Sequence, residues 1–550
     1  MPAKSYLSRY LFSLVIITLI NIPINAQVDS LAEGNYYLEK GIIVEQELIT
    51  EKNQAYKLRL GREQFVQITV EHQGVNIALS LFAPDNQLLV RVNLLSLPYG
   101  TQALNWIAQQ EGEYRLELSA VEQTAPPGRF KLRIEKLHSA TREDKDRVSA
   151  QEKMLAGDQL LKKNDKESTI KGITLYQEAL QCWQTLGDKT SEVLTLLTLS
   201  TSYQVINDFK KASEILERAL LICRDTGKRY EESYLLNNRA MVYYSTGETS
   251  KALEDTNQAL LILRETKNRS GEAIALSNLG NIYTSMGEMQ KALECYTNAL
   301  PLERLYKDEY AESYTLNNIG SLYGQIGELQ KSLDNFFQAL ALKQKIGDLA
   351  GEAQTLSNIG TLYNMLGDRQ KALDYYNRAL PKTQALGNKS QEAFILNNLG
   401  GLCSSSNELE KAIAYHNQAL KICQSIGDRY GESYALNLIA SAYILAKKDM
   451  QKALELCNQA LVIKREIADR PGEADALDNI GSVYSILNDK QNALHYYNQA
   501  LKLRRITDNP LKASFSLFHI AQIEHKLGEF DKARANLQNV INTIETQRRS

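Results

Sequence analysis

Hydrophobic and polar residues follow two different periods along the 550-residue chain, and the period changes near residue 140. Before that point, apolar and polar side chains alternate in the short runs 55–60, 65–70, 77–82, 114–118 and 130–134. Glycine, proline and asparagine separate these runs and mark turns between them. Alternation of this kind predicts an all-β sandwich or small barrel of antiparallel strands over residues 36–138.

Residues 139–147 are charged and poor in apolar side chains, which predicts a short linker or the first exposed turn of a helix. From 148 to 547 the period of the apolar residues is that of helices. The predicted organisation is therefore a leader at 1–26, a β-module at 36–138, a linker at 139–147 and a helical region at 148–547.

The helical region repeats itself every 40 residues. Glycine recurs at Gly280, Gly320, Gly360, Gly400 and Gly481, and alanine opens the second half of most units, as at Ala292. Within one unit, apolar positions share one face of each of two helices, and the glycine and alanine allow those helices to cross closely. Each unit is then a helical hairpin that buries its remaining apolar side only against the next unit.

We count ten units, starting near residues 148, 190, 230, 270, 310, 350, 390, 430, 471 and 511. In the first unit Leu160 stands in place of the glycine, which is typical of a repeat that ends an array. The prediction is a mainly α fold, an α-α solenoid preceded by the β-sandwich.

The residues that carry the pattern are Leu276, Leu279, Gly280, Tyr283, Gly287, Ala292, Tyr296 and Ala299. In order and spacing they resemble the signature of the tetratricopeptide repeat family, with a period longer than the usual 34 residues. This resemblance implies a superhelical solenoid that binds a protein or peptide in its concave groove. The β-module is similar to the small jelly-roll modules found beside secreted bacterial peptidases.

One column, meaning one position followed through successive units, is not explained by packing within the hairpin. It holds Asn238, Asn278, Asn318, Asn358, Asn398 and Asn479, two residues before the glycine column. In the family this position faces the groove, where an amide can donate to and accept from an extended peptide backbone. The alternative is that these amides bond within or between neighbouring hairpins. The lysines of the family's carboxylate clamp are missing from these columns, so its specificity for chaperone tails is not expected here.

Aromatic residues stand four positions before this column, at Tyr234, Tyr314, Phe394 and Tyr434, the last of them before Leu438, which interrupts the asparagines. They line the same predicted groove and could anchor a partner, although aromatic residues at helical spacing are also typical of a core.

The first residues carry a targeting pattern. Lys4 and Arg9 precede an apolar run from Leu11 to Ile20, and small residues follow near Ala26. This pattern predicts a secretory signal at 1–26, with an uncleaved membrane anchor as the alternative. Either segment places the rest of the chain in the periplasm or cell envelope.

The sequence offers no catalytic constellation and predicts neither an enzyme nor a cofactor nor a metal site. Its six histidines are scattered, and its glycines fall at repeat turns rather than in a phosphate-binding loop. The six cysteines have no paired spacing, so we expect single buried thiols. A formal net charge of −2 without a basic stripe argues against nucleic acid as a partner.

The order of leader, β-module, charged segment and repeats also resembles the N-terminal part of cyanobacterial proteins that carry a CHAT-type, caspase-like peptidase domain after their repeats. Two functional hypotheses follow. The chain is either a protein-binding or peptide-binding scaffold of the cell envelope, or the recognition region of a peptidase whose catalytic domain is missing from this chain.

Overall fold

The computed structural model describes residues 36–48, 53–93, 99–121, 128–163, 165–506 and 510–549. The predicted leader at 1–26 lies outside these ranges. The chain divides into two compact units, Met1–Leu322 and Tyr323–Ser550, and each is described by itself. No helix in the described ranges has the length and apolar character needed to cross a membrane.

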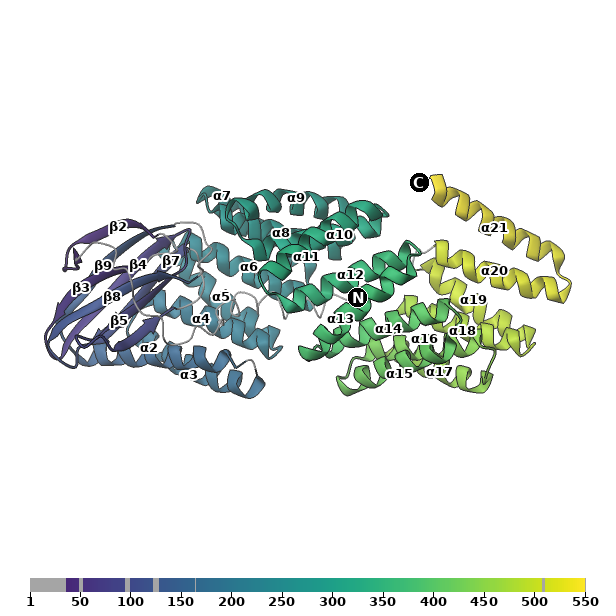
Figure 1. Cartoon of the computed structure of the whole chain (residues 1–550), viewed down its shortest axis with the longest axis horizontal. Helices are drawn as coiled ribbons and strands as arrows, with labels where there is room; N and C mark the ends of the chain where they lie inside the picture. The colour runs from purple at the N-terminus through teal and green to yellow at the C-terminus, as the bar shows by residue number, and fades with distance from the viewer. Residues whose placement is uncertain are drawn as a thin grey trace. The chain divides into compact units, whose positions relative to one another are not determined.

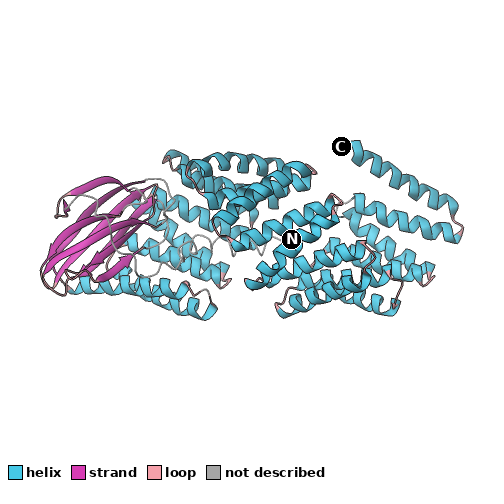
Figure 2. Ribbon diagram, viewed as in Figure 1, coloured by secondary structure: helices cyan, strands magenta, loops and turns pink. Residues whose placement is uncertain are grey.

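The β-module belongs to the first unit and consists of two facing sheets (Figure 2). Its strands are β1 (Tyr36–Tyr37), β2 (Ile43–Leu48), β3 (Gln54–Leu60), β4 (Gln64–Gln73), β5 (Ile77–Phe82), β6 (Leu88–Val92), β7 (Tyr99–Ile107), β8 (Gly112–Ala120) and β9 (Gly128–Ser139). One sheet has the order β1-β3-β8-β5-β6 and the other β2-β9-β4-β7. In both sheets, strands from opposite ends of the module's sequence pair with one another, as β3 with β8 and β2 with β9, which is typical of a jelly roll.

The predicted alternating runs correspond to β3, β4, β5, β8 and β9, so the β-sandwich is confirmed. The runs missed β1, β2, β6 and β7, which are the four edge strands of the two sheets. Strand β2, for example, exposes most of its side chains, so its sequence shows little apolar alternation.

Helices fill the rest of the described chain. They are α2 (Arg142–Leu161), α3 (Lys166–Thr185), α4 (Lys189–Val205), α5 (Phe209–Thr226), α6 (Arg229–Thr246), α7 (Thr249–Glu265), α8 (Arg269–Ser285), α9 (Met289–Leu305), α10 (Glu309–Ile326), α11 (Leu329–Lys345), α12 (Leu349–Met365), α13 (Arg369–Ala385), α14 (Lys389–Ser405), α15 (Leu409–Ser425), α16 (Arg429–Leu445), α17 (Met450–Glu466), α18 (Arg470–Ile486), α19 (Lys490–Ile506), α20 (Pro510–Leu527) and α21 (Phe530–Arg549). Even-numbered helices are the first helices of the hairpins and odd-numbered helices the second, as in α8–α9 and α14–α15 (Figure 1). The predicted linker segment 139–147 holds the end of β9 and the first turns of α2.

A glycine in the first helix and a ring in the second helix allow the two helices of a hairpin to cross closely. A Cβ added at Gly280 would lie 2.5 Å from Cε1 of Tyr296, so only glycine fits beneath this ring. The same pairing occurs in the first hairpin, where a Cβ at Gly157 would lie 2.7 Å from the ring of Tyr176. The prediction that Leu160 replaces this glycine is therefore wrong. Gly157 lies 19 residues before its ring whereas Gly280 lies 16 residues before its ring, so the first glycine falls outside the 40-residue spacing.

First helices of neighbouring hairpins contact one another directly. This holds for α6 and α8 in the first unit, and for the succession α12, α14, α16 and α18 in the second unit. No pair of second helices makes a comparable contact within the described ranges. Each unit therefore bends with its first helices on the inner side, and the exposed side chains there form what we call the first-helix face.

Candidate functional site

Two columns line the first-helix face. The asparagine column is the one predicted above, and the tyrosine column lies one helical turn before it. Aligned on the glycine that meets the ring, the tyrosine column consists of Gln151, Leu194, Tyr234, Ile274, Tyr314, Gln354, Phe394, Tyr434, Asp475 and Phe515. Its residues vary widely from hairpin to hairpin, whereas the glycine column holds only glycine, alanine or serine.

Gln151, the first member of the tyrosine column, binds the backbone of strand β7. The Asn105 N–H donates to Gln151 Oε1 at 2.8 Å, and Gln151 Nε2 donates to the Asn105 carbonyl at 3.1 Å. Strand β7 lies at the edge of its sheet, and Ala108 bonds to Gln64 of β4, so the backbone groups of Asn105 point away from β4. The Gln151 amide thus takes the place of a peptide group in a neighbouring strand.

Strand β7 continues along the next first helices and contacts α4 and α6 as well as α2. Under it, the columns of α4 carry Leu194 and Thr198, which are 7% and 4% exposed. The exposed edge of the sheet is covered by helices in this way, which protects its backbone groups from other chains. In the first three hairpins, the first-helix face therefore already holds an extended segment of polypeptide.

In the first unit, two members of the asparagine column form hydrogen bonds to other residues of the array. Asn238 Nδ2 donates to the carbonyl of Tyr234 in its own helix at 2.9 Å. Asn318 Nδ2 donates to Oδ1 of Asn281 at 3.2 Å, which joins α10 to α8. Asn278 is only 6% exposed. These contacts favour the structural interpretation for Asn238 and Asn318.

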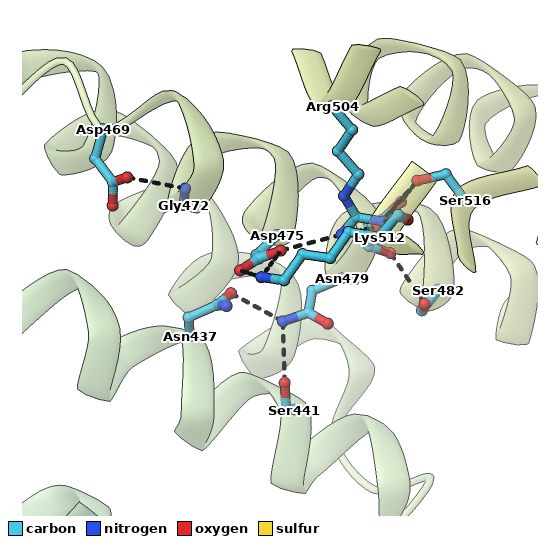
Figure 3. Close-up of polar contacts among 11 residues, drawn as sticks. Asn437, Ser441, Asp469, Gly472, Asp475, Asn479, Ser482, Arg504, Lys512 and Ser516 are labelled. Atoms are coloured by element: carbon cyan, nitrogen blue, oxygen red, sulfur yellow. Dashed lines mark hydrogen bonds and ion pairs between the residues drawn. The ribbon is translucent and has the colours of Figure 1, made fainter. Parts of the chain in front are cut away.

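In the second unit, Asn479 also joins two first helices (Figure 3). Its Nδ2 donates to Oδ1 of Asn437 at 2.8 Å and to Oγ of Ser441 at 3.0 Å, linking α18 to α16. Asn358 and Asn398 are half-buried on α12 and α14. Nδ2 of Asn398 is shielded from solvent and has no hydrogen-bond acceptor in the described part of the chain. Asn398 is therefore a member of the column whose amide donor has no partner within the described ranges.

The tyrosine column is most exposed in the second unit. Phe394 on α14 and Tyr434 on α16 are 48% and 43% exposed. Tyr430, one turn before Tyr434, is 46% exposed, and the sequence analysis missed it because it belongs to neither column. In the first unit, Tyr234 packs against the core, and the Tyr314 ring lies 4.7 Å from that of Tyr310. The aromatic residues of this face are thus core-like near the β-module and exposed in α14, α16 and α20, where Phe515 is 59% exposed.

A charged network surrounds Asp475, the member of the tyrosine column that follows Tyr434 (Figure 3). Asp475 accepts from Arg504 Nη2 at 3.0 Å and from Lys512 Nζ at 2.9 Å. Asp478 also pairs with Arg504, and its burial raises its pKa to about 6. Ser516 Oγ lies 3.1 Å from Asp478. Two cations meet two carboxylates here, so the network links α18, α19 and α20 without offering an unpaired charge.

A second buried carboxyl lies between α8, α9 and α10. Glu303 is 2% exposed, and its Oε1 accepts from the hydroxyls of Ser277 at 2.9 Å and Thr315 at 2.8 Å. Its Oε2 has no hydrogen-bond partner among the described residues. Burial raises the pKa of Glu303 to about 7, and the nearby carboxylates of Asp308 and Glu312 add to the rise.

The residue types that carry out chemistry are dispersed or buried. No group of three histidine, cysteine, aspartate or glutamate residues in the described ranges could hold a metal ion. All six cysteines are free thiols, and Cys182 and Cys295 are only partly buried. Burial raises the pKa of the Cys223 and Cys457 thiols to about 12, which keeps them protonated and unreactive.

Comparison with known proteins identifies the repeat. A sequence model of the family described as "Tetratricopeptide repeat" matches residues 230–305, 311–385, 351–425 and 432–506. A search of curated proteins gave no match.

Several solved structures are similar to this chain. A signal transduction ATPase with a tetratricopeptide repeat sensor from Pyrococcus horikoshii is 18% identical over 61% of this chain, with a TM-score of 0.47, and the match covers about half of that protein, 52%. The apo quorum sensor NprR from B. thuringiensis is 15% identical, with coverage of 66% and 99% of the two chains and a TM-score of 0.48. A Rap protein complexed with Competence and Sporulation Factor is 16% identical, with coverage of 64% and 98% and a TM-score of 0.47.

The family match falls on the hairpins from α6 to α19, and the crossing of glycine and ring residues extends the same hairpin to the start of the helical region. The helical part of this protein is an array of tetratricopeptide repeats.

Proposed function

We propose that the protein is a scaffold that binds an extended segment of a partner polypeptide on its first-helix face, in the groove of the superhelix. The observation that carries the proposal is the seating of strand β7. Gln151 holds both backbone groups of Asn105, and β7 runs on across α4 and α6. A face that accommodates an extended backbone in its first hairpins has the same architecture in its later hairpins.

The later hairpins differ in having exposed side chains where β7 covers the earlier ones. Phe394 and Tyr434 occupy the column of Gln151, and Asn398 adds a shielded amide donor one turn from Phe394. Aromatic anchors surrounded by polar groups are typical of the residues that carry most of the binding free energy at interfaces. This arrangement supports α14 and α16 as the part of the face that a partner occupies.

A peptide-display selection on the immobilised full chain tests the proposal. We expect enriched peptides whose binding is weakened about tenfold or more by Tyr434→Ala, because the loss of a central aromatic anchor costs more than 1 kcal/mol. Phe337→Ala is the matched control, since Phe337 is 38% exposed on a second helix, α11. Peptides that bind both variants as well as the wild type would place the binding site elsewhere and refute the proposal.

We also propose that the chain works outside the cytoplasm, in the cell envelope. The support is the pattern of Lys4, Arg9 and the apolar run that follows, which is typical of a secretory signal. Fractionation of cells that express the full chain, with N-terminal sequencing of the product, tests this. A product in the cytoplasmic fraction with its first residues intact would contradict export.

A further inference from the structure

We propose that the ligand of the second unit is a proline-rich segment in the polyproline II conformation, bound across Phe394, Tyr430 and Tyr434. These three residues are named the aromatic patch. The inference rests on the proposed function and specifies its ligand.

The aromatic patch presents partly exposed rings on two adjacent first helices. Phe394 on α14 and Tyr434 on α16 hold the same column position, and α14 contacts α16 directly. Tyr430 extends the patch by one helical turn, and Lys464 Nζ lies 5.4 Å from the centre of its ring. This cation–π contact joins the Tyr430 ring to α17 and restricts its orientation. Exposed aromatic rings on a firm helical support are the surface on which proline rings pack.

The spacing of the first helices favours a polyproline II helix over a β-strand as the conformation of the bound ligand. Packed helices lie about 8–10 Å apart, so rings on α14 and α16 are separated by about that distance along the face. A polyproline II helix advances about 9 Å per turn of three residues, which brings one ring of the ligand to each first helix. A β-strand places same-side residues about 7 Å apart and loses register with the helices.

The polar surroundings of the patch also match proline. A proline-rich backbone has carbonyl acceptors and few N–H donors. Nδ2 of Asn398, one turn from Phe394, is a donor without an acceptor in the described ranges. On the other side of Tyr434, Asp475 is paired with both Arg504 and Lys512. The patch therefore combines aromatic surface with an unpartnered amide donor, beside a carboxylate whose charge is already paired.

The test measures fluorescence polarisation of a labelled peptide, four repeats of Ala-Pro-Pro, with the full chain. The comparison peptides are four repeats of Ala-Gly-Ser, which is flexible, and six repeats of Thr-Val, which favours β-structure. We expect the Ala-Pro-Pro peptide to bind at least about tenfold more tightly than either. We expect Phe394→Ala and Tyr434→Ala each to weaken it about tenfold, whereas Phe337→Ala leaves it unchanged. Asn398→Ala should weaken it about fivefold.

The outcomes separate this inference from the proposed function. Equal or tighter binding of either comparison peptide, or no binding of the Ala-Pro-Pro peptide, overturns the polyproline II ligand. The proposed function stands in that case if peptides from the display selection still depend on Tyr434. Binding of the Ala-Pro-Pro peptide that is unaffected by Phe394→Ala and Tyr434→Ala overturns the aromatic patch as its site. Circular dichroism of each variant shows whether the array is folded.

Discussion

Replacing Glu303 with glutamine should make the array between α8 and α10 more stable at neutral and alkaline pH. The Glu303 carboxyl is 2% exposed, accepts from Ser277 and Thr315, and faces the carboxylates of Asp308 and Glu312. No cation compensates it among the groups that shift its pKa. Glutamine keeps the acceptor oxygen for the two hydroxyls and removes the charge.

The magnitude follows from the pKa. Burial raises the pKa of Glu303 from 4.5 to about 7, so the folded state keeps its proton while the unfolded state loses it. The stability of the wild-type protein therefore falls as the pH rises from about 4.5 to about 7, and stays lower above that. A shift of about 2.5 pH units corresponds to about 3 kcal/mol. The glutamine variant should match the wild type near pH 4.5 and exceed it by about 3 kcal/mol at pH 8.

Native-state hydrogen exchange of the α8–α10 amides between pH 5 and 8, corrected for intrinsic exchange, measures this difference locally. Denaturant unfolding of the full chain measures it globally. Glu294→Gln is the matched control, because Glu294 is exposed on the same helix, α9, and its replacement should leave the pH dependence unchanged. If Glu303→Gln lowers stability at pH 8, or if its effect does not change with pH, the buried carboxyl is compensated and the reasoning fails.

Three further predictions follow from the packing of the repeats. Gly280→Ala should lower stability by about 1–3 kcal/mol, since its Cβ would meet the Tyr296 ring, and denaturant unfolding checks this. Burial lowers the pKa of His416 to about 4, so only the unfolded chain binds a proton at this residue between about pH 6.5 and pH 4. The stability of the fold should therefore decrease as the pH falls through this range, and thermal unfolding of His416→Phe should show that this dependence is abolished. Gln151→Ala should leave the backbone groups of Asn105 without their partners and lower the free energy of unfolding by about 1–3 kcal/mol. Hydrogen exchange at the Asn105 amide should become faster, whereas an amide that stays protected would show that the β-module is held elsewhere.

Much of the architecture was predictable because the residues that packing requires recur at a fixed spacing in the sequence. The pairing of a glycine with a ring, as in Gly280 with Tyr296, recurs at the 40-residue spacing in several hairpins, and the strands whose side chains alternate between core and solvent were recognised. Where the number of residues between the glycine and the ring changes, the 40-residue spacing of the glycines is lost. Gly157 was missed for this reason, although it meets Tyr176 in the same way.

The candidate site was less predictable because its columns serve more than one purpose. The asparagine column lies on the first-helix face, yet Asn318 and Asn479 bond to neighbouring first helices, and a pattern within one sequence does not distinguish such bonds from ligand binding. The seating of β7 on Gln151 was not foreseen, because a contact between residues 46 positions apart leaves no periodic signal.

Substitutions in the crossing region show how identity at one position depends on another. Tyr296 bonds to Asn281 through its hydroxyl, and Tyr376 and Thr361 make the equivalent contact at 2.9 Å. In the hairpin α14–α15 that partner position is Gly401, and the ring position holds His416, which bonds to Asn397 instead. In this hairpin the hydrogen bond of the ring residue is thus made to Asn397, because Gly401 has no side chain to accept or donate it.

The central claim is that the first-helix face binds an extended polypeptide. The most direct measurement is cross-linking with mass spectrometry of a display-selected peptide, carrying a photoreactive group, bound to the full chain. The account predicts adducts on α14 and α16, around Phe394 and Tyr434, that are lost in the presence of excess unlabelled peptide. Competable adducts confined to the second helices, such as α11 and α15, or to the outer strands of the β-module would contradict it.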